Sequence, residues 1–161
     1  MVKEVKRNYY LNLFSASAEK TINSVLDESG STTGDKVITY KWNIRDLQLG
    51  TNAELGLVQI FHTNAPAGHA NTAYSFRIAE TYADGYDSFN QTSAIVYMGL
   101  GFTPPSIPTY HKLMSSHLNT ITLVITDDNS GADKVFNGID KNIVFGIILH
   151  VIDYVDAYNK F

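Results

Sequence analysis

Cysteine is absent from the 161-residue sequence. Disulfide bonds, thiolate metal ligands and cysteine nucleophiles are therefore excluded. The absence fits a protein made in a reducing compartment, because disulfides form and persist mainly in oxidising ones. The first residues also lack the basic and then apolar pattern of a secretion signal. We therefore expect neither a disulfide framework nor a secreted chain.

An excess of positive charge and long apolar runs are absent as well. The formal net charge is −4, so the composition does not favour phosphate backbones and we expect no nucleic-acid partner. The one basic cluster, "VKEVKR", is either an arm for an acidic partner or, as we favour, a solubilising lead-in. The longest apolar run, residues 142–155, is too short to span a bilayer. It contains Asp153 and His150, which we interpret as a satisfied polar residue, and we expect no membrane span.

What the sequence does contain is a large apolar fraction arranged with a period of two. Hydrophobic residues make up 44% of a chain that has the length of one domain. In residues 37–45, Ile38, Tyr40, Trp42 and Ile44 alternate with more polar neighbours. This alternation is typical of a half-buried strand, and Gly, Pro, Asn and Asp cluster between segments of this kind.

Strands dominate the expected secondary structure. The expected strands are residues 8–15, 37–45, 55–62, 73–80, 93–100, 107–114, 118–126 and 142–154. Short helices are expected at 17–26 and at 110–117, where the helix competes with a weak strand. The pattern predicts an all-β protein: a single jelly-roll β-sandwich of about eight antiparallel strands, with one or two short helices. We expect one domain, with an N-terminal arm and flexible loop including the first strand in residues 1–35 and the jelly-roll body in residues 36–161.

One buried-looking strand runs straight into an acidic stretch, "LNTITLVITDDNSG" at residues 118–131. The oxygens of Asp127, Asp128, Asn129 and Asp133 are of the kind that binds Ca²⁺, but the EF-hand spacing is missing. Asp, Asn, Ser and Gly are also the residues that an exposed turn prefers. We therefore interpret the stretch as a hairpin or loop end.

Histidines and acids provide no catalytic or metal motif. His62 and His69 bracket a loop and could hold Zn²⁺ with a carboxylate, but no HExxH or other ligand spacing is present. No GxSxG elbow marks a Ser–His–Asp triad. Glu80, Asp84 and Asp87 are close in sequence, as paired acids for glycoside hydrolysis could be, yet their loop context favours solvent. We expect no enzyme activity, no catalytic residue, no metal and no cofactor.

Two loops carry the candidate interface residues. Tyr82, Tyr86 and Phe89 lie in one polar loop, where they would either fill the end of the sandwich or contact a partner. The segment "TPPSIPT" is rigid, because proline cannot donate to a strand ladder, so it should skirt a sheet edge. The candidate interface set is therefore Tyr82, Tyr86, Phe89, Pro104, Pro105 and Pro108.

Three stretches together resemble a family of viral proteins. They are "YKWNIRDLQLGTNAELGLVQIFHTN", "YSFRI", and "LNTITLVITDDNSG" followed after a loop by "IVFGIILHVIDY". Their order resembles the single jelly-roll penton and minor capsid proteins of eukaryotic double-stranded DNA viruses, namely large nucleocytoplasmic viruses, virophages and Polinton-like viruses. The resemblance implies a non-enzymatic virion structural protein. It would self-associate, with a pentamer favoured, contact other capsid proteins, and be assembled inside the host cell.

Other function classes fit the same pattern. In a carbohydrate- or receptor-binding β-sandwich module, Tyr82, Tyr86 and Trp42 would stack on a ligand, such as a host-surface glycan, beside Asp84 or Asp87. A β-sandwich hydrolase is a third hypothesis. One fold serves many functions, so the fold alone does not choose among these classes.

Overall fold

A computed structural model describes residues 3–26, 32–62, 72–82, 94–98, 108–127 and 145–156. The described elements are nine strands and one 3-10 turn, η1 (Ser15–Ser17). The strands are β1 (Lys3–Phe14), β2 (Glu19–Leu26), β3 (Thr32–Gln48), β4 (Glu54–His62), β5 (Thr72–Ile78), β6 (Ala94–Met98), β7 (Tyr110–Lys112), β8 (His117–Asp127) and β9 (Phe145–Asp156).

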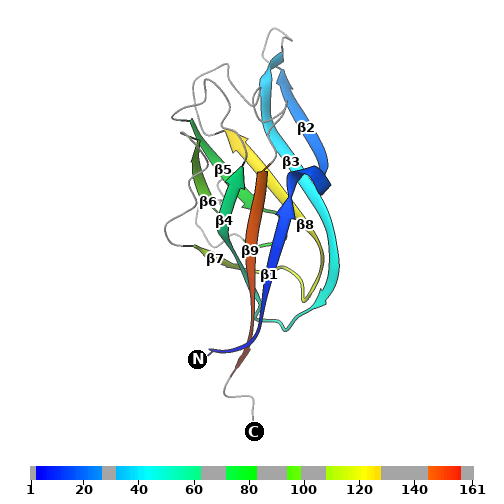
Figure 1. The fold of residues 1–161 in the computed structure, drawn as a ribbon, viewed down its shortest axis with the longest axis vertical. Coiled ribbons are helices and arrows are strands. Elements are labelled where there is room, and N and C mark those ends of the chain that lie inside the picture. The colour runs from blue at the N-terminus through cyan, green and yellow to red at the C-terminus, as the bar shows by residue number, and fades with distance from the viewer. Residues whose placement is uncertain are drawn as a thin grey trace.

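The strands form two antiparallel sheets that face each other. The first sheet has the order β1-β9-β4-β7 and the second sheet the order β2-β3-β8-β5-β6. In Figure 1, β1, β9 and β4 lie in front of β8 and β5. The connections from β3 to β9 cross between the sheets at every step except β5 to β6. Apart from β2, this is the strand order of a jelly roll, so the predicted fold class is confirmed.

The helix predicted for residues 17–26 is wrong. Glu19–Leu26 is strand β2, which pairs with β3 from Glu19 opposite Lys41 to Asn23 opposite Val37. Only the turn at Ser15–Ser17 is helical, and there the hydroxyl of Ser17 donates to the carbonyl oxygen of Phe14 (2.9 Å). The segment lacks an apolar helical stripe, so the free edge of β3 decides its conformation.

The helix predicted for residues 110–117 is also wrong, and the competing weak strand is correct. Tyr110–Lys112 forms the short strand β7, which pairs with Glu54–Gly56 of β4. Its main-chain groups are satisfied by the edge of the first sheet rather than by a helix.

The N-terminal segment belongs to the sandwich. Residues 3–14 form β1, which pairs with β9 from Lys3 opposite Asp156 to Phe14 opposite Gly146. A boundary at residues 35 and 36 falls inside β3, which begins at Thr32.

The core lies between the two sheets and is filled by alternate residues of the long strands. Among the described residues, the fully buried side chains of largest volume are Phe76, Phe145, Leu55, Leu57, Ile78, Ile121, Leu123 and Ile125. Tyr40 packs edge-to-face on Phe145, with ring centroids 4.8 Å apart. The apolar face predicted for β3 therefore faces the core.

Trp42 is part of this core, so the prediction that it stacks on a ligand is wrong. Only 3% of the side chain is exposed, and its Nε1–H donates to the carbonyl oxygen of Phe14 (2.7 Å). A tryptophan on the inner face of a half-buried strand contributes packing area and needs one partner for its N–H.

A buried carboxylate connects β9 to the start of the β3–β4 connection. Asp153 is fully buried and accepts hydrogen bonds from Arg7 Nε (3.2 Å), from the second Arg7 nitrogen (2.9 Å) and from the backbone N–H of Gly50 (2.9 Å). A Cβ added at Gly50 would lie 2.8 Å from the Asp153 carboxylate, so a side chain here would collide with it. The hydrogen bond to Asp153 raises the pKa of Arg7. This arrangement fixes the position of Gly50.

Candidate functional site

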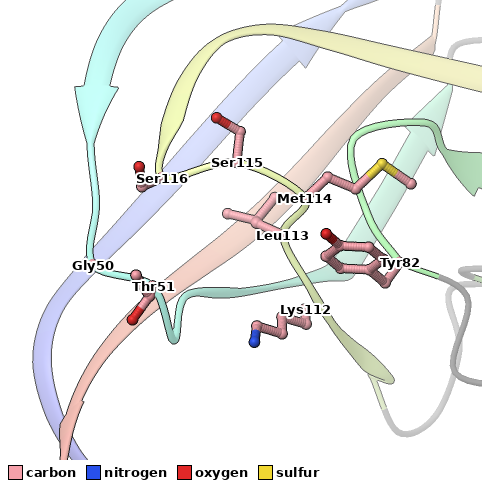
Figure 2. Close-up of a pocket in the computed structure, with 8 residues that line it drawn as sticks. All are labelled: Gly50, Thr51, Tyr82, Lys112, Leu113, Met114, Ser115 and Ser116. Atoms are coloured by element: carbon pink, nitrogen blue, oxygen red, sulfur yellow. The ribbon is translucent and has the colours of Figure 1, made fainter.

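A pocket opens where three connections of the jelly roll meet (Figure 2). It has a volume of about 220 Å³. Its lining comes from the β3–β4 connection, the residues after β5, strand β7 and the β7–β8 connection. The lining residues are Gly50, Thr51, Tyr82, Lys112, Leu113, Met114, Ser115 and Ser116. We call it the Tyr82 pocket.

Backbone hydrogen bonds hold the walls of the Tyr82 pocket in place. The N–H of Tyr82 donates to the carbonyl of Lys112 (2.8 Å), and the N–H of Met114 to that of Glu80 (2.9 Å). The N–H of Leu49 donates to the carbonyl of Ser116 (2.7 Å), and the N–H of Leu113 donates to the carbonyl of Ala53 (3.0 Å). Three segments far apart in sequence are thereby joined, so the pocket is preformed.

The lining combines one aromatic ring with hydroxyls and one cation. Tyr82 and Met114 are each 49% exposed, whereas Leu113 is 5% exposed and closes the floor. Thr51, Ser115 and Ser116 bring hydroxyls, and Lys112 is the only charged residue in the lining that the structure describes. The pocket can therefore bind a ligand that is apolar on one face and rich in hydrogen-bonding groups elsewhere.

A second pocket, of about 230 Å³, shares Met114 and Ser115 with the Tyr82 pocket and includes Glu80 and His117. The Glu80 carboxylate already accepts a hydrogen bond from the backbone N–H of Thr122 (2.9 Å). The His117 ring pairs with Asp46, and both side chains are about half exposed. The Ser115 hydroxyl accepts from the backbone N–H of His117 (3.1 Å) rather than meeting its ring. These contacts are structural and do not form a triad.

The outer face of the first sheet carries a cluster of aromatic rings, which we call the aromatic face: Tyr10, Phe14, Phe61, Tyr110 and His150. Tyr10 stacks on His150, with ring centroids 4.5 Å apart and planes 2° from parallel. Phe14 meets Phe61 edge-on at 5.5 Å. Tyr10 is 63%, Phe14 48% and Phe61 36% exposed, so the face presents apolar area to solvent.

Two glycines allow these rings to lie flat on the sheet. A Cβ at Gly56 would be 2.9 Å from the Tyr110 ring, and a Cβ at Gly146 would collide with the ring of Phe61. Both glycines are therefore needed for close approach of an aromatic ring to the backbone.

His150 is a satisfied polar residue, as predicted. Its Nδ1 lies 2.8 Å from the Tyr110 hydroxyl, and its Nε2 lies 2.9 Å from Asn8 Oδ1. An amide oxygen only accepts, so Nε2 carries the proton and Nδ1 accepts from Tyr110. Burial lowers the pKa of His150 and raises the pKa of Tyr110.

The structure places two of the predicted interface residues. Tyr82 lines the pocket, and Pro108 lies half-buried just before β7. The other interface candidates, Tyr86, Phe89, Pro104 and Pro105, lie outside the described residues. So do Asp84 and Asp87, and so do His69, Asp128, Asn129 and Asp133, which were considered as metal ligands and not favoured. Sequence reasoning missed Lys112 and Thr51, because no local pattern shows that their segments meet. The alternation of Tyr10 and Phe14 with Leu11 and Leu13 was an available signal for the aromatic face.

Within the described ranges, no group of three or more His, Asp or Glu side chains is arranged to hold a metal ion. The same part of the chain contains no helix long and apolar enough to cross a membrane.

No protein-family model and no curated protein matches the sequence. Among solved structures, the chain is similar to the CBM36-1 domain of a multidomain xylanase from the hindgut metagenome of Trinervitermes trinervoides, with 10% identity, a TM-score of 0.38 and coverage of 92% of this chain and 99% of that domain. It is also similar to the K1 cleaved adhesin domain of Lys-gingipain from Porphyromonas gingivalis W83, with 9% identity, a TM-score of 0.29 and 95% coverage of both chains. These values are too low to transfer a ligand to this chain.

Proposed function

We propose that this chain is a carbohydrate-binding β-sandwich module and that the Tyr82 pocket is its binding site. The observation that carries the proposal is the half-exposed Tyr82 ring in a preformed pocket lined by Thr51, Ser115 and Ser116. A pyranose has an apolar face of C–H groups, which are attracted to the negative face of an aromatic ring. Its equatorial hydroxyls need donors and acceptors, which side-chain hydroxyls supply.

The rigidity of the pocket supports the same proposal. Sugars bind weakly when a protein must order its own loops, because that entropy is subtracted from the affinity. Here the backbone of Tyr82 is bonded to Lys112, and that of Met114 to Glu80, before any ligand arrives. Neither of these features requires a reacting group, so binding alone accounts for both.

The test is calorimetric titration of the purified protein with a panel of neutral and acidic oligosaccharides. Tyr82→Ala should lower the affinity for any ligand found by about tenfold or more, because it removes the ring. Tyr82→Phe keeps the ring and should retain most of the binding. Tyr10→Ala is the matched control, because Tyr10 is also an exposed tyrosine and lies on the aromatic face, outside the pocket lining. A panel without a single ligand, or equal losses for Tyr82→Ala and Tyr10→Ala, would reject the proposal.

A second candidate function is a virion structural subunit, and a specific observation favours it. The aromatic face leaves Tyr10, Phe14 and Phe61 exposed on the outer side of the first sheet. Exposed apolar side chains gathered on one face are typical of surfaces that bury against a neighbour. In this proposal copies of the chain pack through the aromatic face into a closed ring, with five copies favoured.

The oligomeric state tests the second candidate. Light scattering on a size-exclusion column gives the absolute mass, and negative-stain images show whether a ring exists. A ring that dissociates in the double variant Tyr10→Ser with Phe14→Ser, but not in Tyr82→Ala, would support a structural subunit. A monomer at every concentration that binds a glycan would leave the carbohydrate-binding proposal as the better one.

A further inference from the structure

The Tyr82 pocket contains one feature that a site for neutral sugars does not need, namely the charged side chain of Lys112. The described lining holds this ammonium group and no carboxylate. The chain as a whole has a net charge of −4, so the charge of Lys112 in the pocket is opposite in sign to the net charge of the protein. An ammonium group gains a charge-assisted hydrogen bond when its ligand brings the opposite charge.

Lys112 is the exposed last residue of β7, so its side chain is open to solvent. The residue opposite it in the sheet register is Glu54, on β4. Neither of the ion pairs that the structure describes, Arg7 with Asp153 and His117 with Asp46, involves Lys112. In Figure 2 the amino group of Lys112 points away from the Tyr82 ring and lies on the side of Thr51.

From this geometry we infer that the pocket selects acidic sugars, with the pyranose ring on Tyr82 and its anionic substituent at Lys112. The inference rests on the proposed carbohydrate-binding function and deepens it by naming the ligand class. Lysine is a point charge with three donors, unlike the planar fork of arginine. The shared chemistry is therefore an anionic group, either the carboxylate of a uronic or sialic acid or a sulfate ester.

The size of the preference follows from the exposure of the pocket. Lys112 is exposed and reachable by solvent, so its contact with an anion is screened. We expect an acidic sugar to bind about fivefold more tightly than its neutral parent. The preference should fall as the salt concentration rises from about 50 mM to about 500 mM. Added salt shortens the Debye length and so screens the attraction between Lys112 and the anion.

The experiment compares matched ligands by calorimetry: sialyllactose and sulfated lactose against lactose, and glucuronate hexamers against glucose hexamers. The protein variants are wild type, Lys112→Gln, Lys112→Arg, Tyr82→Ala and the control Lys41→Gln, an exposed lysine of the second sheet. Melting temperatures confirm that each variant is folded. The expected result is a preference for the acidic member that is lost in Lys112→Gln and kept in Lys112→Arg and Lys41→Gln.

The outcomes separate this inference from the function on which it rests. Equal binding of acidic and neutral sugars by wild type would overturn the inference and leave carbohydrate binding in place. A preference that persists in Lys112→Gln would overturn it too, since another group would then bind the anion. Binding of no probe at all would overturn both. Comparison of the carboxylate-bearing sugars with the sulfated sugar shows which anionic group the pocket accepts.

Discussion

Replacing Trp42 with phenylalanine tests the central correction that the structure makes, namely that this tryptophan belongs to the core. Trp42 is 3% exposed, and its indole N–H is 2.7 Å from the Phe14 carbonyl oxygen. Trp42→Phe keeps a buried ring but removes the hydrogen bond, which lowers the free energy of unfolding by about 1 kcal/mol. The smaller ring also leaves a cavity, which lowers it by about 1–2 kcal/mol more. The expected loss of about 2–3 kcal/mol corresponds to a fall in melting temperature of roughly 5–10 °C for a domain of this size.

The assay uses urea denaturation followed by far-UV circular dichroism, because Trp42 is the only tryptophan and the variant has no tryptophan fluorescence. In the wild type, Trp42 emission should be blue-shifted when folded and shift to the red on unfolding. Addition of a sugar ligand should leave that emission unchanged. Tyr82→Phe is the surface control and should change stability by less than about 0.5 kcal/mol. An unchanged urea midpoint in Trp42→Phe, or Trp42 emission that responds directly to ligand, would refute the core assignment.

Two further predictions concern the fully buried Asp153 and the half-buried His150. Asp153→Asn should lower the urea midpoint far more than Asp46→Asn, because Asp153 is fully buried between Arg7 and a backbone N–H while Asp46 is half exposed; similar midpoints would contradict this. Burial lowers the pKa of His150 in the folded state, so the unfolded chain binds more protons near pH 6.5 and stability should fall as pH drops through that value. Melting temperatures from about pH 7.5 to pH 5 should show a shallower fall in His150→Gln, and parallel curves would count against the prediction.

The two candidate functions use different parts of one molecule. The Tyr82 pocket lies where connections between the sheets meet, and the aromatic face lies on the outer side of the first sheet. Variants of Tyr82 and Lys112 therefore report on ligand binding, whereas variants of Tyr10 and Phe14 report on assembly. A jelly roll can hold both surfaces, since neither site interferes with the core that the sheets share.

The fold could be predicted largely because a strand is recognisable from the alternation of apolar and polar residues within a short segment. Alternation in residues 37–45 places Tyr40 and Trp42 on the inner face of β3, and a similar period marks β8. Where this local signal was weak the prediction was wrong, as in residues 17–26. That segment has no periodic apolar face of either kind, and only the unpaired edge of β3 offers its backbone groups their partners.

The sequence by itself determined the fold class and most of its strands, because a side-chain period of two is a property of neighbouring residues. It could not determine the Tyr82 pocket, since Thr51, Tyr82 and Lys112 are distant in the chain and meet only through backbone hydrogen bonds between connections. Nor could it determine that Gly146 supports Phe61 or that Gly56 supports Tyr110. Contacts of this kind depend on strand order and register, and these are decided only when the two sheets are assembled.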